Sequence, residues 1–192
     1  MKERPILFTG EMVRAILDGR KTQTRRVVKD VVEGPGGWPS FTKGRHHGNM
    51  VKPKYCTYGQ HGDLLYVREA FIHQPAEYLP EASCSIPFVE EHTVYRADVP
   101  GDSAGAGWSP SIHMPKRLCR LWLRVKSVRV ERVQDISIDD AFAEGVRCIN
   151  DRERIEFRKL WDSINAKRGF GWDVNPWTWV IEFDRTTPTG GR

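Results

Sequence analysis

A run of alternating apolar residues changes parity partway along the chain, and this feature restricts the fold most strongly. Leu121, Leu123 and Val125 share one face of an extended chain, and Val128 and Val130 continue with opposite parity. Side chains alternate between the two faces of a strand, so burial of both halves requires one extra residue, a β-bulge. The pattern predicts a long, bent strand of the kind found in a small β-barrel.

Capping and periodicity signals predict further elements around this strand. A helix is expected between the N-capping residue Thr9 and Gly19, and a second one between Ser137 and Gly145. We expect a third helix over residues 152–165 and strands over residues 64–67, 93–96 and 177–183. Short strands mixed with a few helices favour an α+β fold over a regular βαβ array.

Two stretches rich in glycine, proline and small polar residues, 30–61 and 73–113, show no sustained periodicity. We interpret them as long loops inserted into one domain that spans residues 1–185. Residues 186–192 are expected to form a disordered tail. A chain of 192 residues is within the range of a single hydrophobic core.

Composition indicates which partners suit the chain. The 30 Lys and Arg against 25 Asp and Glu give a net charge of +5, which fits an anionic partner such as RNA and equally fits simple solubility. No stretch approaches the roughly 20 apolar residues of a membrane span. The four cysteines form no Cys-x-x-Cys pair and suit a reducing compartment. We expect a cytoplasmic protein, monomeric by default.

Metal and cofactor sites are not expected. The candidate ligands have spacings that match no standard zinc pattern; they are His46, His47, Cys56, His61 and Cys84. The glycine-rich stretches lack the lysine and the following helix of a phosphate loop.

Residues 19–26 form the densest group of candidate functional residues. They include the cations Arg20, Lys21, Arg25 and Arg26, with threonine hydroxyls between them. Guanidinium, ammonium and hydroxyl groups together bind phosphate, so the segment suits a nucleotide. An ordinary solvated basic turn explains the charge alone equally well.

The same segment resembles the signature of the ASCH family, Gly-x-Lys-x-x-Glu-x-Arg, through Gly19, Lys21, Thr24 and Arg26. Residues 62–67, 140–145 and 179–183 support the resemblance, and the layout is similar to that of prophage-encoded members. The resemblance implies a PUA-like β-barrel with flanking helices, into which the two long loops are inserted. Thr24 departs from the signature, which has glutamate at that position.

The Lys-x-x-Thr pattern is similar to that of the bacterial ASCH amidohydrolases that deacetylate N(4)-acetylcytidine. This resemblance implies a catalytic set of Lys21, Thr24 and Glu144, in which the lysine activates the threonine and the glutamate orients the lysine or relays a proton. A lysine acts as a base only if burial lowers its pKa. A regular strand would place Lys21 and Thr24 on opposite faces, so an interruption between them is required. Without the resemblance, the position of Glu144 just before the helix-ending Gly145 favours an ordinary solvent-exposed side chain.

Candidate substrate-binding residues are Arg25, Arg26, Glu69 and Trp172. Trp172 has glycine neighbours, so we expect an exposed ring on which a base stacks. The favoured function is hydrolysis of an acylated nucleoside or modified base. Two alternatives stay open: a non-catalytic RNA-binding module, and a metal-independent ribonuclease in which the cations of residues 21–26 stabilise the developing charge.

Overall fold

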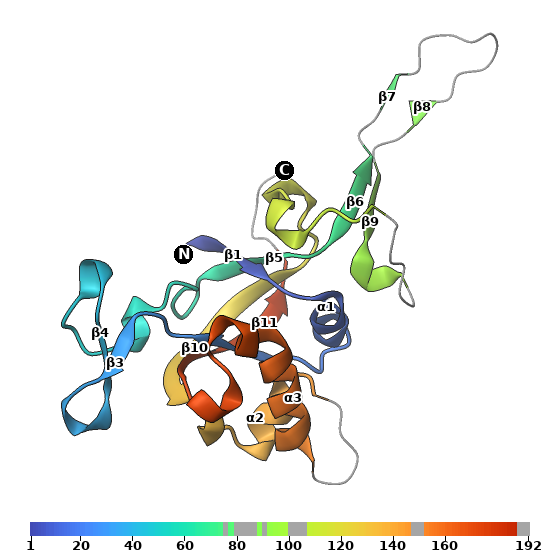
Figure 1. Cartoon of the computed structure of the whole chain (residues 1–192). Helices are drawn as coiled ribbons and strands as arrows, with labels where there is room; N and C mark the ends of the chain where they lie inside the picture. Colours follow the sequence, from blue (N-terminus) through green and yellow to red (C-terminus); the bar gives the residue numbers. More distant parts are fainter. Residues whose placement is uncertain (75–76, 79–87, 90–91, 100–106, 147–151, 188–192) are drawn as a thin grey trace.

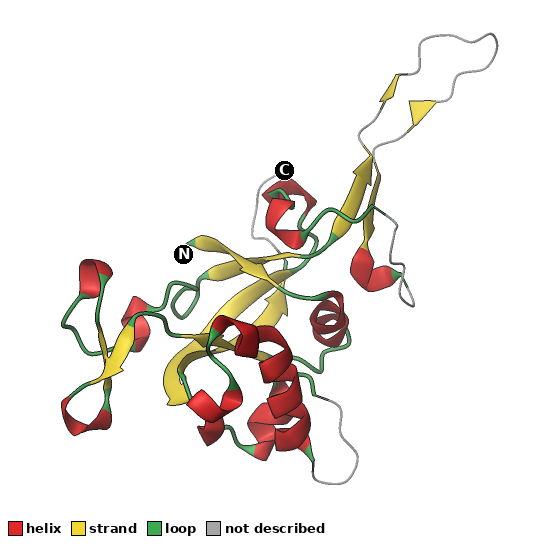
Figure 2. Cartoon of the chain, viewed as in Figure 1, coloured by secondary structure: helices red, strands yellow, loops and turns green. Residues whose placement is uncertain are grey.

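The computed structural model describes residues 1–74, 77–78, 88–89, 92–99, 107–146 and 152–187. A five-stranded sheet of order β1-β5-β10-β11-β2 forms its centre (Figures 1 and 2). Its strands are β1 (Glu3–Leu7), β2 (Gln23–Val27), β5 (Leu64–Arg68), β10 (Trp122–Arg132) and β11 (Trp177–Thr186). β1 and β5 are parallel, and the other neighbours are antiparallel. The predicted α+β class is confirmed.

The predicted bulge lies in β10. Val125 pairs with Phe183 and Ser127 pairs with Glu182, so Lys126 is the extra residue. The bulge lets Val125 on one side and Val128 on the other both pack on the core, which explains the change of parity in the sequence.

The sheet is curved but open. Within the described residues no backbone ladder joins the edge strands β1 and β2, so a closed barrel is not formed. The edges approach each other through a side chain, because the Arg26 guanidinium donates to the Leu7 carbonyl at 2.6 Å. The core lies inside the curve and includes Ile6, Phe8, Val13, Leu65, Val67, Leu123, Val125, Trp179, Ile181 and Phe183.

Three α-helices accompany the sheet, close to the predicted positions. α1 (Gly10–Leu17) is capped by the Thr9 hydroxyl, and Gly19 follows it with a φ of 74°. α2 (Ile138–Ala143) is capped by Ser137, and α3 is Glu153–Asn165. α2 and α3 pack together with the end of β10 around a second apolar cluster of Val133, Ile136, Ala141, Phe157, Trp161 and Trp172.

The first predicted loop is wrong in part. Residues 30–61 contain the hairpin of β3 (Val31–Glu33) and β4 (Pro39–Phe41), which projects from the sheet in Figure 1. Short 3-10 helices also occur there, at Pro35–Gly37, Gly44–His46 and Pro53–Tyr55. Strands of three residues are too short to give a periodicity in the sequence.

The second predicted loop also contains strands. β6 (Phe71–Gln74) pairs with β9 (His92–Tyr95), and β7 (Glu77–Tyr78) pairs with β8 (Phe88–Val89). Part of the segment 73–113 lies outside the described residues, namely 75–76, 79–87, 90–91 and 100–106. Further 3-10 helices are Arg96–Asp98, Ser111–His113, Lys116–Leu118, Val133–Asp135, Ala166–Arg168 and Trp172–Val174.

The predicted tail of residues 186–192 is wrong at its first residue, which belongs to β11. Thr186 pairs with Trp122 as the last residue of β11, and residues 188–192 lie outside the described part. Among the described helices, none is both long and apolar enough to cross a membrane.

Candidate active site

Lys21 and Glu144 are brought together by backbone pairing between remote parts of the chain. The two residues form an isolated antiparallel bridge, and the Thr22 amide donates to the Ala143 carbonyl at 2.8 Å. The regular strand β2 begins only at Gln23. The Thr22 carbonyl still accepts from the Phe183 amide of β11 at 2.9 Å, so the pairing with β11 continues from Gln23 to Thr22. The interruption expected between Lys21 and Thr24 is therefore not seen in this backbone pairing.

The Lys21 ammonium is enclosed by protein. Its side chain is 0% exposed, and Nζ donates to Glu144 Oε2 at 2.8 Å and to the Glu144 carbonyl at 2.9 Å. Burial lowers the pKa of Lys21 below its usual value, although the Glu144 carboxylate acts in the opposite direction. Lys21 therefore combines a lowered pKa with a fixed orientation, the two properties that a lysine base needs.

Glu144 lies between two buried cations. Its Oε1 accepts from Arg25 at 3.2 Å, while its other carboxylate oxygen is bound to Lys21. The Arg25 side chain is also 0% exposed and donates to Asp140 at 2.9 Å and to Glu131 at 3.1 Å. Although Arg25 borders the pocket described below, these three carboxylates orient its guanidinium, so it holds Glu144 in place more directly than it offers donors to a substrate.

Arg129 extends the ion-pair network behind Arg25. Its guanidinium donates to Asp140 at 2.7 Å and to Gln23 at 3.0 Å, and also pairs with Glu131 and Glu182. Burial alone would raise the pKa of Asp140, but the charges of Arg25 and Arg129 outweigh it and keep that pKa below its usual range. Asp140 stays ionised and keeps Arg25 oriented toward Glu144.

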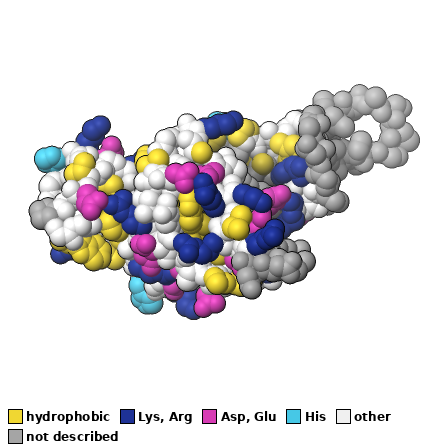
Figure 3. Space-filling view, turned by 60° about the horizontal axis from the view of Figure 1, so that its bottom comes forward, with side chains coloured by type: hydrophobic (Ala, Val, Ile, Leu, Met, Phe, Trp, Pro, Cys, Tyr) yellow, Lys and Arg dark blue, Asp and Glu magenta, His cyan; other side chains and the backbone are white. Residues whose placement is uncertain are grey.

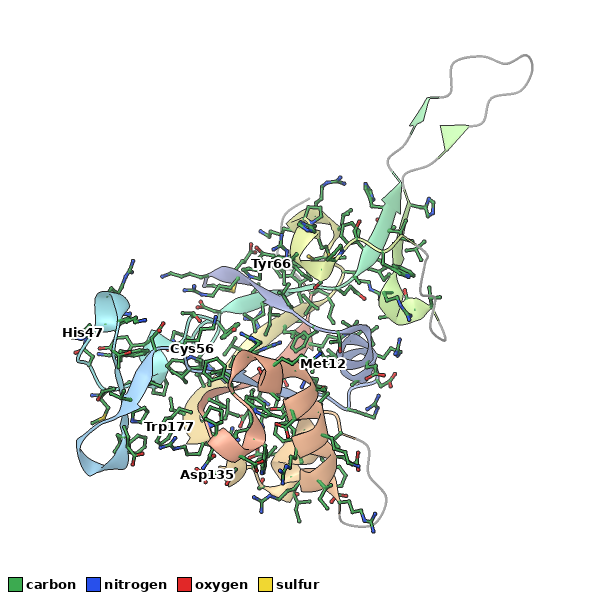
Figure 4. The ribbon with its side chains drawn as sticks, viewed as in Figure 1. Met12, His47, Cys56, Tyr66, Asp135 and Trp177 are labelled. Atoms are coloured by element: carbon green, nitrogen blue, oxygen red, sulfur yellow. The ribbon has the colours of Figure 1, made fainter. Side chains whose placement is uncertain are left out.

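A cavity of about 120 Å³ opens beside this pair. Its lining comes from α1, β2 and α3, and includes Met12, Thr24, Arg25, Arg26, Tyr58, Glu144, Phe157, Trp161 and Arg168. Met12 belongs to α1, and in Figure 4 it lies on the side of that helix toward α3. Pockets for drug-sized ligands measure about 300–1,000 Å³, so this cavity accepts a small group and not a whole nucleoside.

Thr24 is buried at 3% exposure and lines the cavity together with Glu144. Lys21 Nζ donates to Glu144 and makes no hydrogen bond to the Thr24 hydroxyl. The structure therefore places the three predicted catalytic residues around one site, with a direct Lys21–Glu144 contact and no Lys21–Thr24 contact.

Arg26 lies at the edge of the cavity between two rings. Its guanidinium is 5.0 Å from the centroid of Phe8 and 5.9 Å from that of Tyr58. Lys29 and Arg168 line the same cavity, so its entrance is cationic. The guanidinium also donates to the Leu7 carbonyl, and the role of Arg26 in holding a substrate stays a prediction.

Trp172 is buried, which corrects the expectation of an exposed stacking platform. The indole is 9% exposed and packs edge-on against Phe157, with ring centroids 6.2 Å apart. Its glycine neighbours suggested exposure, but the apolar side of α3 covers the ring. Trp172 supports the helix that forms one wall of the cavity.

Glu69 is remote from the cavity lining. It follows β5, which β10 and β11 separate from β2 in the sheet, and its carboxylate is 1% exposed. Burial raises its pKa despite the neighbouring Arg120, whose guanidinium donates to it at 3.0 Å. Because Arg120 also binds Asp98, Glu69 belongs to a separate ion-pair cluster and does not reach a substrate beside Lys21.

The described cysteines are poor nucleophiles. Burial raises the pKa of both Cys56 and Cys119 to about 11, so their thiols stay protonated near neutral pH. In the described part of the chain, no group of three or more His, Cys, Asp or Glu residues is arranged to hold a metal ion.

Sequence reasoning missed Arg129, Glu131 and Tyr58. Asp140 belongs to the segment 140–145 of the family resemblance, but its ion pairs with Arg25 and Arg129 have no signal in the local sequence. Some of their contacts join residues more than 100 positions apart, such as Arg25 and Glu131 with a separation of 106.

Comparisons with known proteins show only low similarity to this chain. No family model matches the chain, and no curated protein matches it. A protein of Enterococcus faecalis described by the family model DUF984 is similar in structure, with a TM-score of 0.45 and 11% identity over 100% of this chain and 86% of the other. An ASCH domain from Lactobacillus crispatus has a TM-score of 0.44 and 12% identity over 96% and 79%.

The second of these structures carries the name of the family that the sequence motifs resemble. At this level of similarity nothing about activity transfers from either protein. The chemistry proposed below rests on the residues of this chain.

Proposed function

We propose that this protein is an amidohydrolase that removes an acyl group from a modified nucleoside or base, such as N(4)-acetylcytidine. The observation that carries the proposal is the buried Lys21–Glu144 pair, with Nζ to Oε2 at 2.8 Å, beside a cavity lined by Thr24. A buried lysine with a lowered pKa next to a hydroxyl is a means of activating that hydroxyl. We further propose that the open sheet is a variant of the PUA-like barrel.

The hydrogen bonds of Lys21 suit the neutral amine. A neutral amine has two N–H groups and one lone pair, and Lys21 donates two hydrogen bonds, both to Glu144. The lone pair is then available to accept the Thr24 proton. Arg25 also binds Glu144, and it shares its positive charge with Asp140 and Glu131. The proposed mechanism requires Nζ to move from its contacts with Glu144 toward Thr24.

The proposed reaction has two steps. The Thr24 oxygen attacks the amide carbonyl while its proton passes to Lys21; the C–N bond then breaks, and the leaving amine takes that proton. Water attacks the resulting acyl-threonine ester and gives a proton to Lys21; the ester C–O bond then breaks, Lys21 returns that proton to the Thr24 oxygen, and the acid is released. The sum is amide plus water giving amine plus carboxylic acid.

The cavity and its entrance fit the proposed substrate. An acetyl amide is a small group that suits a cavity of about 120 Å³, and the cationic entrance with Arg26 and Tyr58 suits a base and its phosphate.

The test is release of cytidine from N(4)-acetylcytidine, followed by chromatography. Thr24→Ala, Lys21→Met and Glu144→Gln should each reduce turnover by at least about a hundredfold, the scale on which a catalytic base contributes. Thr22→Ala is the matched control, because Thr22 is exposed and lies two residues from Thr24 outside the cavity lining. Undiminished turnover of Thr24→Ala rules out the threonine nucleophile.

A wild-type protein that releases no cytidine contradicts the amidohydrolase. Incubation of the same preparation with RNA then distinguishes the two alternatives, because a ribonuclease shortens the RNA and a binding module only retains it.

A further inference from the structure

A second depression adjoins the candidate active site. The two share Val27, Lys29 and Tyr58 in their linings, so they form one continuous surface. The second depression has a volume of about 330 Å³ and is formed by the end of β2 and residues 41–58. Its further lining residues include Asp30, Phe41, Lys43, Arg45, His46, Tyr55 and Trp179. We call the two depressions together the groove.

The groove carries unbalanced positive charge. Neither Lys29 nor Arg45 has an ion-pair partner in the part of the chain that the structure describes. Lys43 approaches Asp30 only at 3.9 Å, with both side chains more than half exposed, so this pair contributes little. Arg26 and Arg168 continue the cations on the other side of Tyr58. On the face shown in Figure 3, basic and acidic side chains are interspersed.

Aromatic rings lie among these cations. His46 and Tyr55 have ring centroids 4.2 Å apart, and Phe41 meets Tyr55 edge-on at 5.9 Å. All three side chains are only partly buried, and Lys54 Nζ lies 5.1 Å from the Tyr55 centroid. Alternating cations and partly exposed rings are typical of surfaces that bind single-stranded nucleic acids, where bases stack and phosphates pair with cations.

We infer that the groove binds a single-stranded polynucleotide, so that the acyl amide of the modified base enters the cavity at Thr24 while the base lies at the entrance and flanking nucleotides extend toward Arg45. The inference rests on the proposed function for the identity of the base in the cavity. The cavity is too small for a whole nucleoside, and the continuation of the surface past Lys29 gives the sugar and the next phosphates a cationic path. The hairpin of β3 and β4, which the sequence suggested was a loop, supports one wall of this path through Phe41.

The experiment measures binding of unmodified ten-nucleotide RNA and DNA by fluorescence anisotropy over a range of salt concentrations. Lys43→Ala/Arg45→Ala is compared with Arg124→Ala/Lys126→Ala, which removes the same charges from exposed positions outside both depressions. Each phosphate contact with a single strand contributes about 0.7 to the salt slope, so the groove variant should lose about 1.4. Extrapolated from 1 M salt, this is about a 25-fold weaker affinity at 0.1 M.

Equal affinities of the groove and control variants would overturn the inference, as would equally tight binding of a duplex, whose paired bases cannot stack on Tyr55. A preference between the RNA and DNA arms identifies the natural polymer. Both variants alter exposed side chains, and matching thermal unfolding curves exclude misfolding. Binding of an unmodified strand requires no turnover, so failure of this experiment is distinguishable from failure of the proposed hydrolysis.

Discussion

Replacing Lys21 by methionine should change how the stability of the protein depends on pH. The folded protein holds Lys21 at a lowered pKa, whereas the unfolded chain restores the usual value of 10.5. Between these two pKa values the unfolded chain binds one proton more, so the stability of the wild type rises with pH. The slope for one proton is about 1.4 kcal/mol per pH unit. Below the folded pKa the penalty is constant, and above 10.5 it is gone.

The assay is urea unfolding followed by fluorescence of the seven tryptophans. The difference in unfolding free energy between wild type and Lys21→Met should become more favourable to the wild type as the pH rises from about 6 to about 10. The contributions of other titrating groups to the unfolding free energy cancel in this difference when the substitution leaves those groups undisturbed.

Lys126→Met provides the control, because Lys126 is largely exposed at 57% and its difference should stay constant. A difference for Lys21→Met that is equally constant would refute the reasoning. Lys21 would then be charged in the folded protein throughout this range and would have no lone pair for the Thr24 proton.

Three further substitutions test the remaining parts of the site. Arg25→Met should lower kcat while leaving KM nearly unchanged, because Arg25 positions Glu144; a change confined to KM would identify it as a substrate-binding residue instead. Trp172→Ala should lower stability by about 3–5 kcal/mol in urea unfolding, the usual cost of truncating a buried tryptophan; a cost below about 1 kcal/mol would argue for an exposed ring. Glu69→Gln should leave turnover within about twofold, since Glu69 binds Arg120 away from the cavity; a loss comparable to that of Glu144→Gln would contradict this placement.

Local signals in the sequence predicted much of the central fold. The Thr9 cap and Gly19 bounded α1, and the parity change around Lys126 located the bulge of β10. Such features depend on residues close together in the chain, so they can be predicted without a structure. The hairpin of β3 and β4 was missed because each strand has only three residues and glycines and prolines surround it.

The candidate site was predictable only through the family resemblance. Lys21 and Glu144 are 123 residues apart, and no spacing rule connects them. Arg25 shows the limit of the resemblance, because a cation of the basic segment was expected at the substrate and instead binds three carboxylates from β10 and the α2 region. The prediction that Trp172 is exposed was wrong for a related reason, because its burial depends on Phe157 of another element.

The central claim is that Thr24 carries the acyl group during hydrolysis. The most direct measurement is mass spectrometry of the protein quenched during turnover of N(4)-acetylcytidine, followed by peptide mapping. We predict one added acetyl group on the peptide that contains Thr24, and neither this adduct nor cytidine release in Thr24→Ala. Cytidine release that continues at the wild-type rate in Thr24→Ala would contradict the account.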